Sequence, residues 1–379
     1  MTLRWKPTPL HGRRGSWFRR HRPQGEMIDL SSDVVTLPTP AMRKAIFRAE
    51  LGNDASGLDP TVNRLQAMAA ERVGKEAALL VASGTMGNLV VALVYCRHGE
   101  GFIVGSQAHM NVWEPGIREV AGLKPLAVPN LPDATLDLDS LESQFASGAP
   151  DLPPLKMLTL ENSHNRCGGV AMTPDVMSGS VQWARRRGLM LHLDGSRVFN
   201  TSVALGIGVP ELTRAFDSVM FCLSKGLSCP VGSLICGDKQ FIQDARRMRT
   251  RVGGDMRQAG IIAAAGIVAL DQMVDRLHED HDNAKYLAQR IRQLDALRLA
   301  QPTVDTNIVR FHLVDSTMDP AVFVGHLAER GLSVSMDPPP LMRAVMHSGI
   351  DRPAVTRAAD ILEQVLPEEL ARSDHSTGG

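Results

Sequence analysis

Short apolar runs alternate with helical stretches between residues 77 and 237. Strands buried on both faces of a parallel sheet are typically apolar runs of this kind. Their alternation with helical stretches predicts a mostly parallel sheet between two layers of helices. We expect helices at 85–97 and at 174–187, the second beginning with a proline after Thr173. The expected strands are 77–82, 102–104, 125–128, 156–160, 189–193, 218–223 and 233–235.

The pattern changes after the last of these strands. Residues 257–270 are small and apolar nearly all round, which predicts a buried helix, whereas residues 271–294 are amphipathic and charged. Beyond Pro302 we expect a compact α+β unit. Its predicted elements are strands at 307–313, 332–335 and 342–347 and helices at 320–330 and 352–365. The chain is therefore divided into a tail at 1–26, a large domain at 27–285 and a small C-terminal domain at 286–371.

Composition and charge exclude several classes of protein. The 379 residues carry 41 Lys and Arg against 41 Asp and Glu, so no global field attracts nucleic acid or an anionic membrane. The longest apolar run falls short of the ~20 residues that span a bilayer. Five cysteines form no C-x-x-C pair, which argues against a disulfide framework or a structural zinc site and fits a reducing cytoplasm. No metal site is expected.

The N-terminal tail is the one charged segment. Residues 1–26 hold seven basic side chains and a single acid, and they lack the apolar core of a secretory signal. We expect a disordered basic arm. A targeting peptide and a true start at Met27 are the alternatives.

Candidate chemistry follows the predicted strands, at the edge where ligands bind in open α/β sheets. Gly84 and Thr85 open a helix after the first strand, and the free N–H groups of such a turn suit a phosphate. Five further polar residues follow other strands: His109, His164, Asp194, Arg197 and Lys225. Each of them alone is an ordinary loop residue, a helix cap or a surface charge. Their convergence on one edge of one sheet indicates a shared site.

This set of residues suits pyridoxal 5′-phosphate. A partly buried lysine amine can bind the aldehyde of this cofactor covalently. A buried carboxylate such as Asp194 can pair with the protonated pyridine nitrogen and keep the ring an electron sink. An imidazole can stack on the ring, and an arginine can hold the carboxylate of an amino acid with two parallel hydrogen bonds.

The chain resembles the threonine aldolases, a family of fold-type-I pyridoxal phosphate enzymes related to aspartate aminotransferase. The resemblance covers residues 27–350 in order and at family-like spacings. It rests on the segments 28–36, 52–54, 59–63, 74–78, 83–85, 108–109, 161–165, 194–197, 223–227, 230–233, 256–258 and 279–284. It implies an α/β fold with a seven-stranded, mostly parallel sheet in the large domain, and a smaller α+β domain.

The resemblance also implies roles for individual residues. Lys225 would be the lysine that binds pyridoxal phosphate, Asp194 the partner of the pyridine nitrogen, and His109 the ring that stacks on it. The other cofactor contacts would be Gly84, Thr85, Arg197, Ser224 and Arg257, the last reaching a phosphate across a dimer interface.

For the substrate, the resemblance implies that Ser32, Arg197 and Arg343 hold the carboxylate and that His164 lies near the hydroxyl. The implied reaction is cleavage of L-threonine, L-allo-threonine or a related L-β-hydroxy-α-amino acid to glycine and an aldehyde. The catalytic base stays open between His109, His164 and a water between them. The family also implies a homo-oligomer, expected here as a tetramer of two dimers in the cytoplasm.

The sequence departs from the family pattern around the expected pocket. Ser31 stands where the family usually has arginine, Ser196 where it has alanine, and Arg166 and Cys167 follow the His-Asn motif. These departures bear on the choice of substrate more than on the chemistry. Two other functions remain open, namely another fold-type-I lyase or transaminase acting on an amino acid, and a protein of this fold without catalysis.

Overall fold

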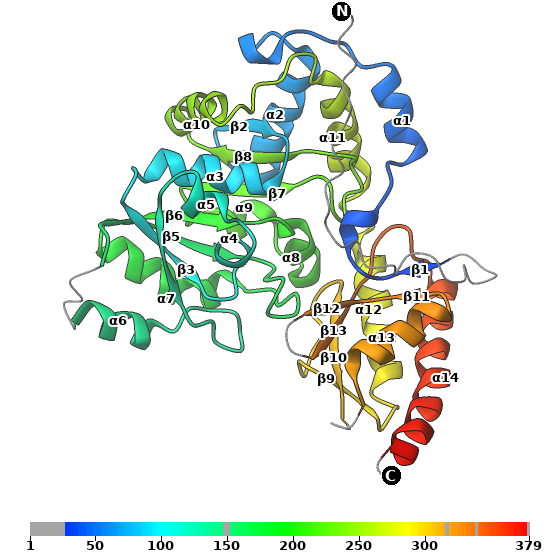
Figure 1. The fold of residues 1–379 in the computed structure, drawn as a ribbon. Coiled ribbons are helices and arrows are strands. Elements are labelled where there is room, and N and C mark those ends of the chain that lie inside the picture. Colours follow the sequence, from blue (N-terminus) through cyan, green and yellow to red (C-terminus); the bar gives the residue numbers. More distant parts are fainter. Residues whose placement is uncertain (1–26, 147–151, 315–317, 338–339, 377–379) are drawn as a thin grey trace, which may run out of the picture.

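A seven-stranded sheet forms the centre of the larger part of the molecule, as the computed structural model shows (Figure 1). The structure describes residues 27–146, 152–314, 318–337 and 340–376, so the predicted tail at 1–26 lies outside the described residues. Within these ranges, no helix combines the length and the hydropathy needed to cross a bilayer.

The strand order of this sheet is β2-β8-β7-β6-β5-β3-β4. Only β8 runs antiparallel to its neighbours, so the prediction of a mostly parallel sheet is confirmed. The observed bounds match the seven predicted strands within two residues. They are β2 Ala77–Val81, β3 Gly101–Gly105, β4 Lys124–Val128, β5 Leu155–Glu161, β6 Met190–Asp194, β7 Ser218–Cys222 and β8 Ser233–Gly237.

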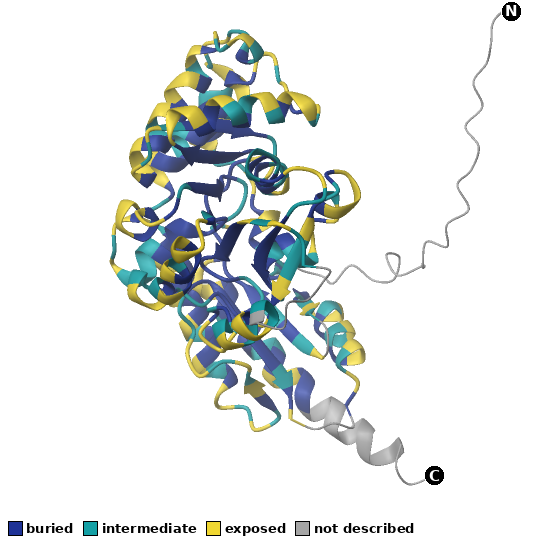
Figure 2. Ribbon diagram, turned by 90° about the vertical axis from the view of Figure 1, so that its left-hand side faces the viewer, coloured by how far each residue is buried: buried dark blue, intermediate teal, exposed yellow. Residues whose placement is uncertain are grey.

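Helices cover both faces of the sheet because successive strand residues point to opposite sides. Leu80 packs in the larger apolar cluster on one face, whereas Leu79 and Val81 pack in a second cluster on the other. Figure 2 shows the buried strands between their more exposed helices. The helices of the first face are α2 Pro60–Val73, α7 Pro174–Arg186, α8 Val198–Leu205, α9 Val209–Thr213 and α11 Gly260–Gln272, and those of the second are α3 Gly84–Tyr95, α5 Gly116–Glu119 and α10 Lys239–Arg251. The short helices α4 His109–Val112 and α6 Leu138–Ala146 lie in the connections on either side of β4.

The N-terminal segment links the two parts of the molecule. β1, Ile28–Asp29, pairs in parallel with β11, Leu332–Ser333, and Ile28 packs in the core of the C-terminal part. The segment continues through the 3-10 turn η1 Asp33–Val35, the helix α1 Pro40–Phe47, which packs on α11, and the turn η2 Asp54–Ser56.

The predicted helix at 257–270 begins later than expected. The backbone N–H groups of Asp54 and Ala55 bind the carbonyl groups of Arg257 and Met256, which holds these two residues in a non-helical link. The N–H of Gly260 then binds the Asp59 carboxylate at 2.9 Å, and α11 begins there.

The C-terminal part is an α+β unit, as the sequence predicts (Figure 1). Its four-stranded sheet has the order β12-β13-β10-β9, all antiparallel. The predicted strand at 332–335 is divided between β11 and β12, because the two pair with different partners. Further bounds are α12 Leu277–Ile291, β9 Leu297–Leu299, β10 Ile308–Leu313, α13 Pro320–Glu329, β12 Ser335–Asp337, β13 Leu341–Val345 and α14 Arg352–Ser376.

Candidate active site

Several of the predicted site residues lie at or just after the carboxyl ends of neighbouring strands in the large sheet. Glu161 and Asp194 are paired across β5 and β6 at the carboxyl ends of both strands. One oxygen of the Glu161 carboxylate accepts the N–H of His109 at 2.7 Å, and the other accepts the N–H of Asn165 at 2.8 Å. One buried carboxylate thus ties together the loops that carry His109 and His164.

A chain of buried hydrogen bonds connects His109 with Asp194. His109 Nδ1 lies 2.8 Å from Glu114 Oε1, and the amide nitrogen of Asn88 donates to Glu114 Oε1 and to Asp194 Oδ2, both at 2.9 Å. Asn88 Oδ1 lies 3.2 Å from His192 Nε2, and His192 Nδ1 lies 2.9 Å from the Ser218 hydroxyl. These contacts assign Asn88 as the donor to both carboxylates and His192 Nε2–H as the donor to Asn88.

The electrostatics of this chain agree with that assignment. Burial lowers the pKa of His192 to about 4, so its ring is neutral at pH 7. Burial also opposes the charged form of His109, but the Glu114 hydrogen bond and the charges of Asp194 and Glu114 outweigh it and raise the pKa of the His109 imidazole. Burial raises the pKa of Glu114 as well. The His109–Glu114 pair therefore holds a proton more tightly than an exposed histidine does.

Lys225 lies on the loop after β7 and is half-buried. Within the described residues its amine makes no hydrogen bond and no ion pair. Its backbone carbonyl accepts the Thr36 hydroxyl at 3.0 Å, which fixes the loop to the N-terminal segment. The Lys225 charge acts on both His109 and Asp33. The amine is therefore free for chemistry among the predicted residues.

Gly84 and Thr85, the residues expected to contact a phosphate, lie at the start of α3. The Ser83 hydroxyl accepts the Met86 N–H, which leaves Gly84 and Thr85 in the first turn. A Cβ atom on Gly84 would lie 2.8 Å from the Cys222 sulfur, so a glycine is needed for α3 to approach the end of β7. Ser224 follows that end two residues later, half-buried. The turn and the lysine loop thus adjoin.

Arg197 is paired with Asp33 rather than free. Its Nε and Nη2 atoms bind the two carboxylate oxygens of Asp33 at 2.7 and 2.8 Å, and both side chains are buried. Burial opposes ionisation of Asp33, but Arg197 holds the pKa of this carboxyl far below its usual range, with help from Lys225 and Arg343. One edge of the Arg197 guanidinium is therefore used inside the protein, which the sequence analysis did not foresee.

Arg343 and Ser32 lie beside this pair. Arg343, on β13, makes a long hydrogen bond of 3.4 Å from Nη1 to the Ser335 hydroxyl, and its Nε is buried without a hydrogen bond. Burial and the Arg197 charge lower the pKa of Arg343. Ser32 caps η1 by accepting the Val34 N–H, directly before Asp33.

His164 is buried and asymmetrically bonded. Its Nδ1 accepts the backbone N–H of Cys167 at 3.3 Å, and its Nε2 is buried with no partner in the described residues. In a neutral ring that accepts at Nδ1, the proton is on Nε2. His164 is thus a hydrogen-bond donor at Nε2.

Arg257 is the predicted site residue that stays apart. It is exposed on the link before α11, and across the described ranges its side chain contacts none of the other predicted site residues. Its expected role requires a neighbouring subunit and stays a prediction.

Asn88, Glu114, Glu161 and Asp33 were not assigned roles from the sequence. The sequence did contain signals for three of them. Asp33 and Glu161 lie in segments that carry the family resemblance, and Glu114 is a carboxylate only five residues after His109. His192 is fully buried and bonded to Asn88.

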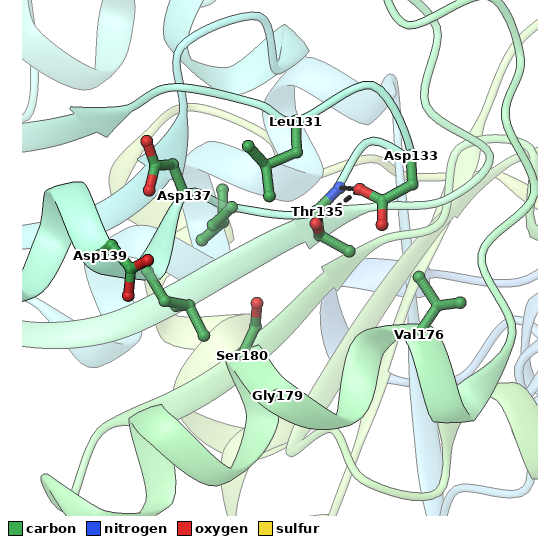
Figure 3. A pocket seen from close by; sticks show the side chains of 10 residues that line it. Leu131, Asp133, Thr135, Asp137, Asp139, Val176, Gly179 and Ser180 are labelled. Carbon is green, nitrogen blue, oxygen red and sulfur yellow. Dashed lines mark hydrogen bonds between the residues drawn. The ribbon is translucent and has the colours of Figure 1, made fainter.

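Two further features could be mistaken for binding sites, namely a cluster of potential metal ligands and a surface hollow. Donor atoms of His109, Glu114 and Asp194 lie within 4.8 Å of one another, but Asn88 and the imidazole proton occupy the space between them. A separate hollow lies between the 131–139 turn and α7 (Figure 3), and none of the predicted site residues lines it.

Comparison with known proteins places this chain in a family. Residues 29–314 match the β-eliminating lyase family. The chain is 39% identical to low-specificity L-threonine aldolase 1 of Arabidopsis thaliana over 89% of this chain and 96% of that protein. It is 40% identical to the low specificity L-threonine aldolase of Escherichia coli K12 over 88% of this chain and 97% of that protein.

Solved structures share the fold at lower identity. A threonine aldolase of Leishmania major has a TM-score of 0.77 and 17% identity, with 89% of this chain and 99% of that chain covered. An L-allo-threonine aldolase assigned in Listeria monocytogenes has a TM-score of 0.73 and 17% identity, with 87% and 92% covered. The fold class predicted from the sequence, that of fold-type-I enzymes, is therefore confirmed.

Proposed function

The chain belongs to the threonine aldolases of the β-eliminating lyase family, and from this premise we propose that it is a pyridoxal 5′-phosphate-dependent carbon–carbon lyase. Its substrates are L-threonine, L-allo-threonine or related L-β-hydroxy-α-amino acids, which it cleaves to glycine and an aldehyde. The observation that carries the proposal is the free Lys225 amine, whose charge acts on the His109 ring. That ring is in turn connected to Asp194 by the hydrogen bonds of Glu114 and Asn88.

The residues present fit the cofactor. Gly84, Thr85 and Ser224 offer a small, N–H-rich turn for a phosphate, and Lys225 offers an unpaired amine for the aldehyde. The Asp194 carboxylate accepts hydrogen bonds from Asn88 Nδ2 at 2.9 Å and from the Ser196 N–H at 3.1 Å, which orients it for a pyridine N–H. When bound, pyridoxal phosphate supplies a covalent link to the substrate amine and a sink for the electron pair of the broken Cα–Cβ bond.

The substrate carboxylate is bound by Arg343 together with Arg197 and Ser32. Arg343 Nε is buried without a hydrogen bond, and an unpaired buried guanidinium is stabilised by an incoming carboxylate. Arg197 contributes only the nitrogen atoms that face away from Asp33. Asp33 fixes the orientation of that guanidinium.

His109 is the better candidate for the base that takes the β-hydroxyl proton. With Nδ1–H donating to Glu114, its Nε2 carries a lone pair once the ring is neutral. His164 is oriented the opposite way, because its Nδ1 accepts from Cys167 and its Nε2 carries the proton. His164 therefore donates a hydrogen bond to a substrate oxygen, while His109 accepts the proton.

The test is glycine release from a panel of L-β-hydroxy-α-amino acids, with Lys225→Ala as the matched variant. We expect wild-type protein to release glycine and an aldehyde, and the variant to lose about a thousandfold or more of the rate together with the visible absorbance that bound pyridoxal phosphate gives. A keto acid or a decarboxylated amine as product would indicate a different fold-type-I enzyme. Equal rates for variant and wild type would overturn the assignment.

A homotetramer in the cytoplasm completes the proposal. Large apolar side chains of the N-terminal segment and of the loop after the η2 turn are exposed in the single chain, among them Leu37 at 73%, Phe47 at 89% and Leu58 at 70%. Apolar side chains gathered in this way mark contact surfaces between subunits. Light scattering of the purified full-length protein tests the assembly.

A further inference from the structure

One face of the C-terminal sheet carries an unusual pair of like charges. Arg310 of β10 and Arg343 of β13 are directly opposite each other in the antiparallel ladder. Side chains that are opposite in this way lie on the same face, about 5 Å apart, and like charges there repel. The adjacent residues Val309, Phe311 and Met342 pack in the core on the other face. Both arginines therefore point away from that core.

Too little negative charge surrounds this pair. Asp337 Oδ2 lies 3.5 Å from Arg310 Nε, and among the described residues the Arg343 side chain is hydrogen-bonded only to the neutral Ser335 hydroxyl. Burial lowers the pKa of both arginines. The Arg197 charge lowers the pKa of Arg343 further, and the charges of Asp337 and Asp33 offset these effects only in part. The nearby carboxylate of Asp33 is already matched by Arg197. The charged form of the pair is thus under-compensated.

Arg166 extends this arginine cluster, which we define as Arg166, Arg197, Arg310 and Arg343. The Arg166 carbonyl accepts a hydrogen bond from Arg310 Nη1, and the Arg166 and Arg310 charges act on each other. Arg166 Nε is buried, and its side chain has no hydrogen-bond partner in the part of the chain that the structure describes. Of these four guanidinium groups, two form ion pairs within the described ranges: Arg197 with Asp33 and Arg310 with Asp337.

We propose that the arginine cluster binds a second carboxylate of the substrate, so that the preferred substrates are L-β-hydroxy-α-amino acids with a carboxylate on the side chain. The inference rests on the proposed function and adds the substrate class. The α-carboxylate binds Arg343 and neutralises one unmatched positive charge. A second carboxylate, bound by Arg166 and Arg310, neutralises the second unmatched charge of the cluster. Guanidinium groups suit this task because each presents parallel N–H donors to a planar anion.

The simplest such substrate is L-3-hydroxyaspartate. Its cleavage breaks the Cα–Cβ bond while the hydroxyl proton moves to the base, so that the β-carbon becomes an aldehyde carbonyl. The α-carbon then takes a proton, and the products are glycine and glyoxylate. Atoms and electrons balance without an oxidant or a reductant.

The experiment compares kcat/KM for glycine release from both β-epimers of L-3-hydroxyaspartate and from L-threonine. We expect the wild-type holoenzyme to prefer a 3-hydroxyaspartate at least tenfold. Arg166→Gln should lower that ratio tenfold or more, since Arg166 adds charge without a structural hydrogen bond. The control is Arg298→Gln, which removes an exposed arginine from β9 of the same sheet and should leave the ratio unchanged.

Binding provides a second measurement that does not depend on turnover. Titration calorimetry should detect succinate binding to the wild type at least tenfold more tightly than propionate, and Arg166→Gln should remove the difference. Threonine cleavage with no preference for 3-hydroxyaspartate, or a ratio unchanged in Arg166→Gln, would overturn the second-carboxylate site and leave the aldolase assignment standing. Failure of the assignment itself would appear instead as equal rates for Lys225→Ala and wild type on every substrate.

Discussion

Asp33 and Arg197 form a bidentate buried ion pair, 164 residues apart in the chain, with N–O distances of 2.7 and 2.8 Å. The pair joins the N-terminal segment to the loop after β6. Its geometry leaves Arg197 with one free edge toward the site. Arg197, which was expected to hold the substrate carboxylate together with Ser32 and Arg343, is therefore itself held in place by Asp33.

Asp33→Asn should destabilise the protein by about 3–5 kcal/mol, because the substitution leaves the buried Arg197 charge without its counter-charge. Urea unfolding followed by circular dichroism measures this loss. Asp244→Asn is the control, since Asp244 pairs with Arg247 on the exposed side of α10 and should contribute less than about 1 kcal/mol. Equal losses in the two variants would contradict the assigned importance of the buried pair.

The Asp33–Arg197 pair also predicts a pH dependence. The pKa of Asp33 is lower in the folded protein than in the unfolded chain, so the pair stabilises the fold above the unfolded value of about 4. That contribution is lost progressively as the pH falls below about 4. The wild type should therefore lose more stability than Asp33→Asn between pH 5 and pH 3. Parallel stability curves for the two proteins would exclude this linkage.

Glu114→Gln should shift the pH dependence of catalysis. The Glu114 hydrogen bond and charge raise the pKa of His109, so their removal lowers it. If neutral His109 is the base, the ascending limb of kcat/KM moves to lower pH in the variant. Nuclear magnetic resonance of the histidine rings should show the same shift without substrate. Glu119→Gln, an exposed change on the neighbouring helix α5, is the control and should leave both curves in place.

The fold was largely predictable where burial alone determines the pattern. The strands β3, β7 and β8 are buried along their whole length and mainly apolar because both faces are covered, and all seven sheet strands were located. The helices α1 and α2 were missed although Thr39-Pro40 and Asp59-Pro60 carry the same start signal as Thr173-Pro174. β1 could not be found, since two residues become a strand only by pairing with β11, some 300 residues away.

The site was predictable to the extent that topology alone determines it. Residues that follow parallel strands share one edge, so Asp194 and Lys225 could be placed together from the sequence. Glu114 and Asn88 could not, because each lies in a helical stretch or connection where a polar residue is ordinary. Their roles depend on how α3 packs against β6, and only the three-dimensional structure supplies that contact.

His164 should behave as a hydrogen-bond donor rather than as a base. We expect His164→Ala to lose about 10- to 100-fold in kcat/KM, because the substrate oxygen that accepts from His164 would be left buried without a hydrogen bond. Such a loss corresponds to roughly 1–3 kcal/mol. His164→Gln places an amide N–H near the position of Nε2 and should recover most of that loss. Neither variant should move the ascending limb of the pH profile. A moved limb would assign the base to His164 instead.

Arg257 offers a test of whether the site is shared between subunits. Its side chain is exposed and lies apart from the other predicted site residues in a single described chain, whereas its backbone carbonyl accepts the N–H of Asp54 at 2.9 Å. The link before α11 is thereby fixed against the η2 turn, next to the exposed Leu58. This placement suits an arginine that acts in the site of a neighbouring subunit. Arg257→Ala and Lys225→Ala should each be nearly inactive as pure proteins.

Mixing the two variants separates action within one subunit from action between subunits. A mixed dimer of Lys225→Ala and Arg257→Ala contains one site with an intact Lys225, and the subunit across from it carries an intact Arg257. If Arg257 acts across the interface, that site is complete and refolding the variants together restores up to about a quarter of the wild-type rate, because half of the dimers are mixed and each has one working site. If Arg257 acts within its own chain, every site lacks one group and the mixture stays inactive.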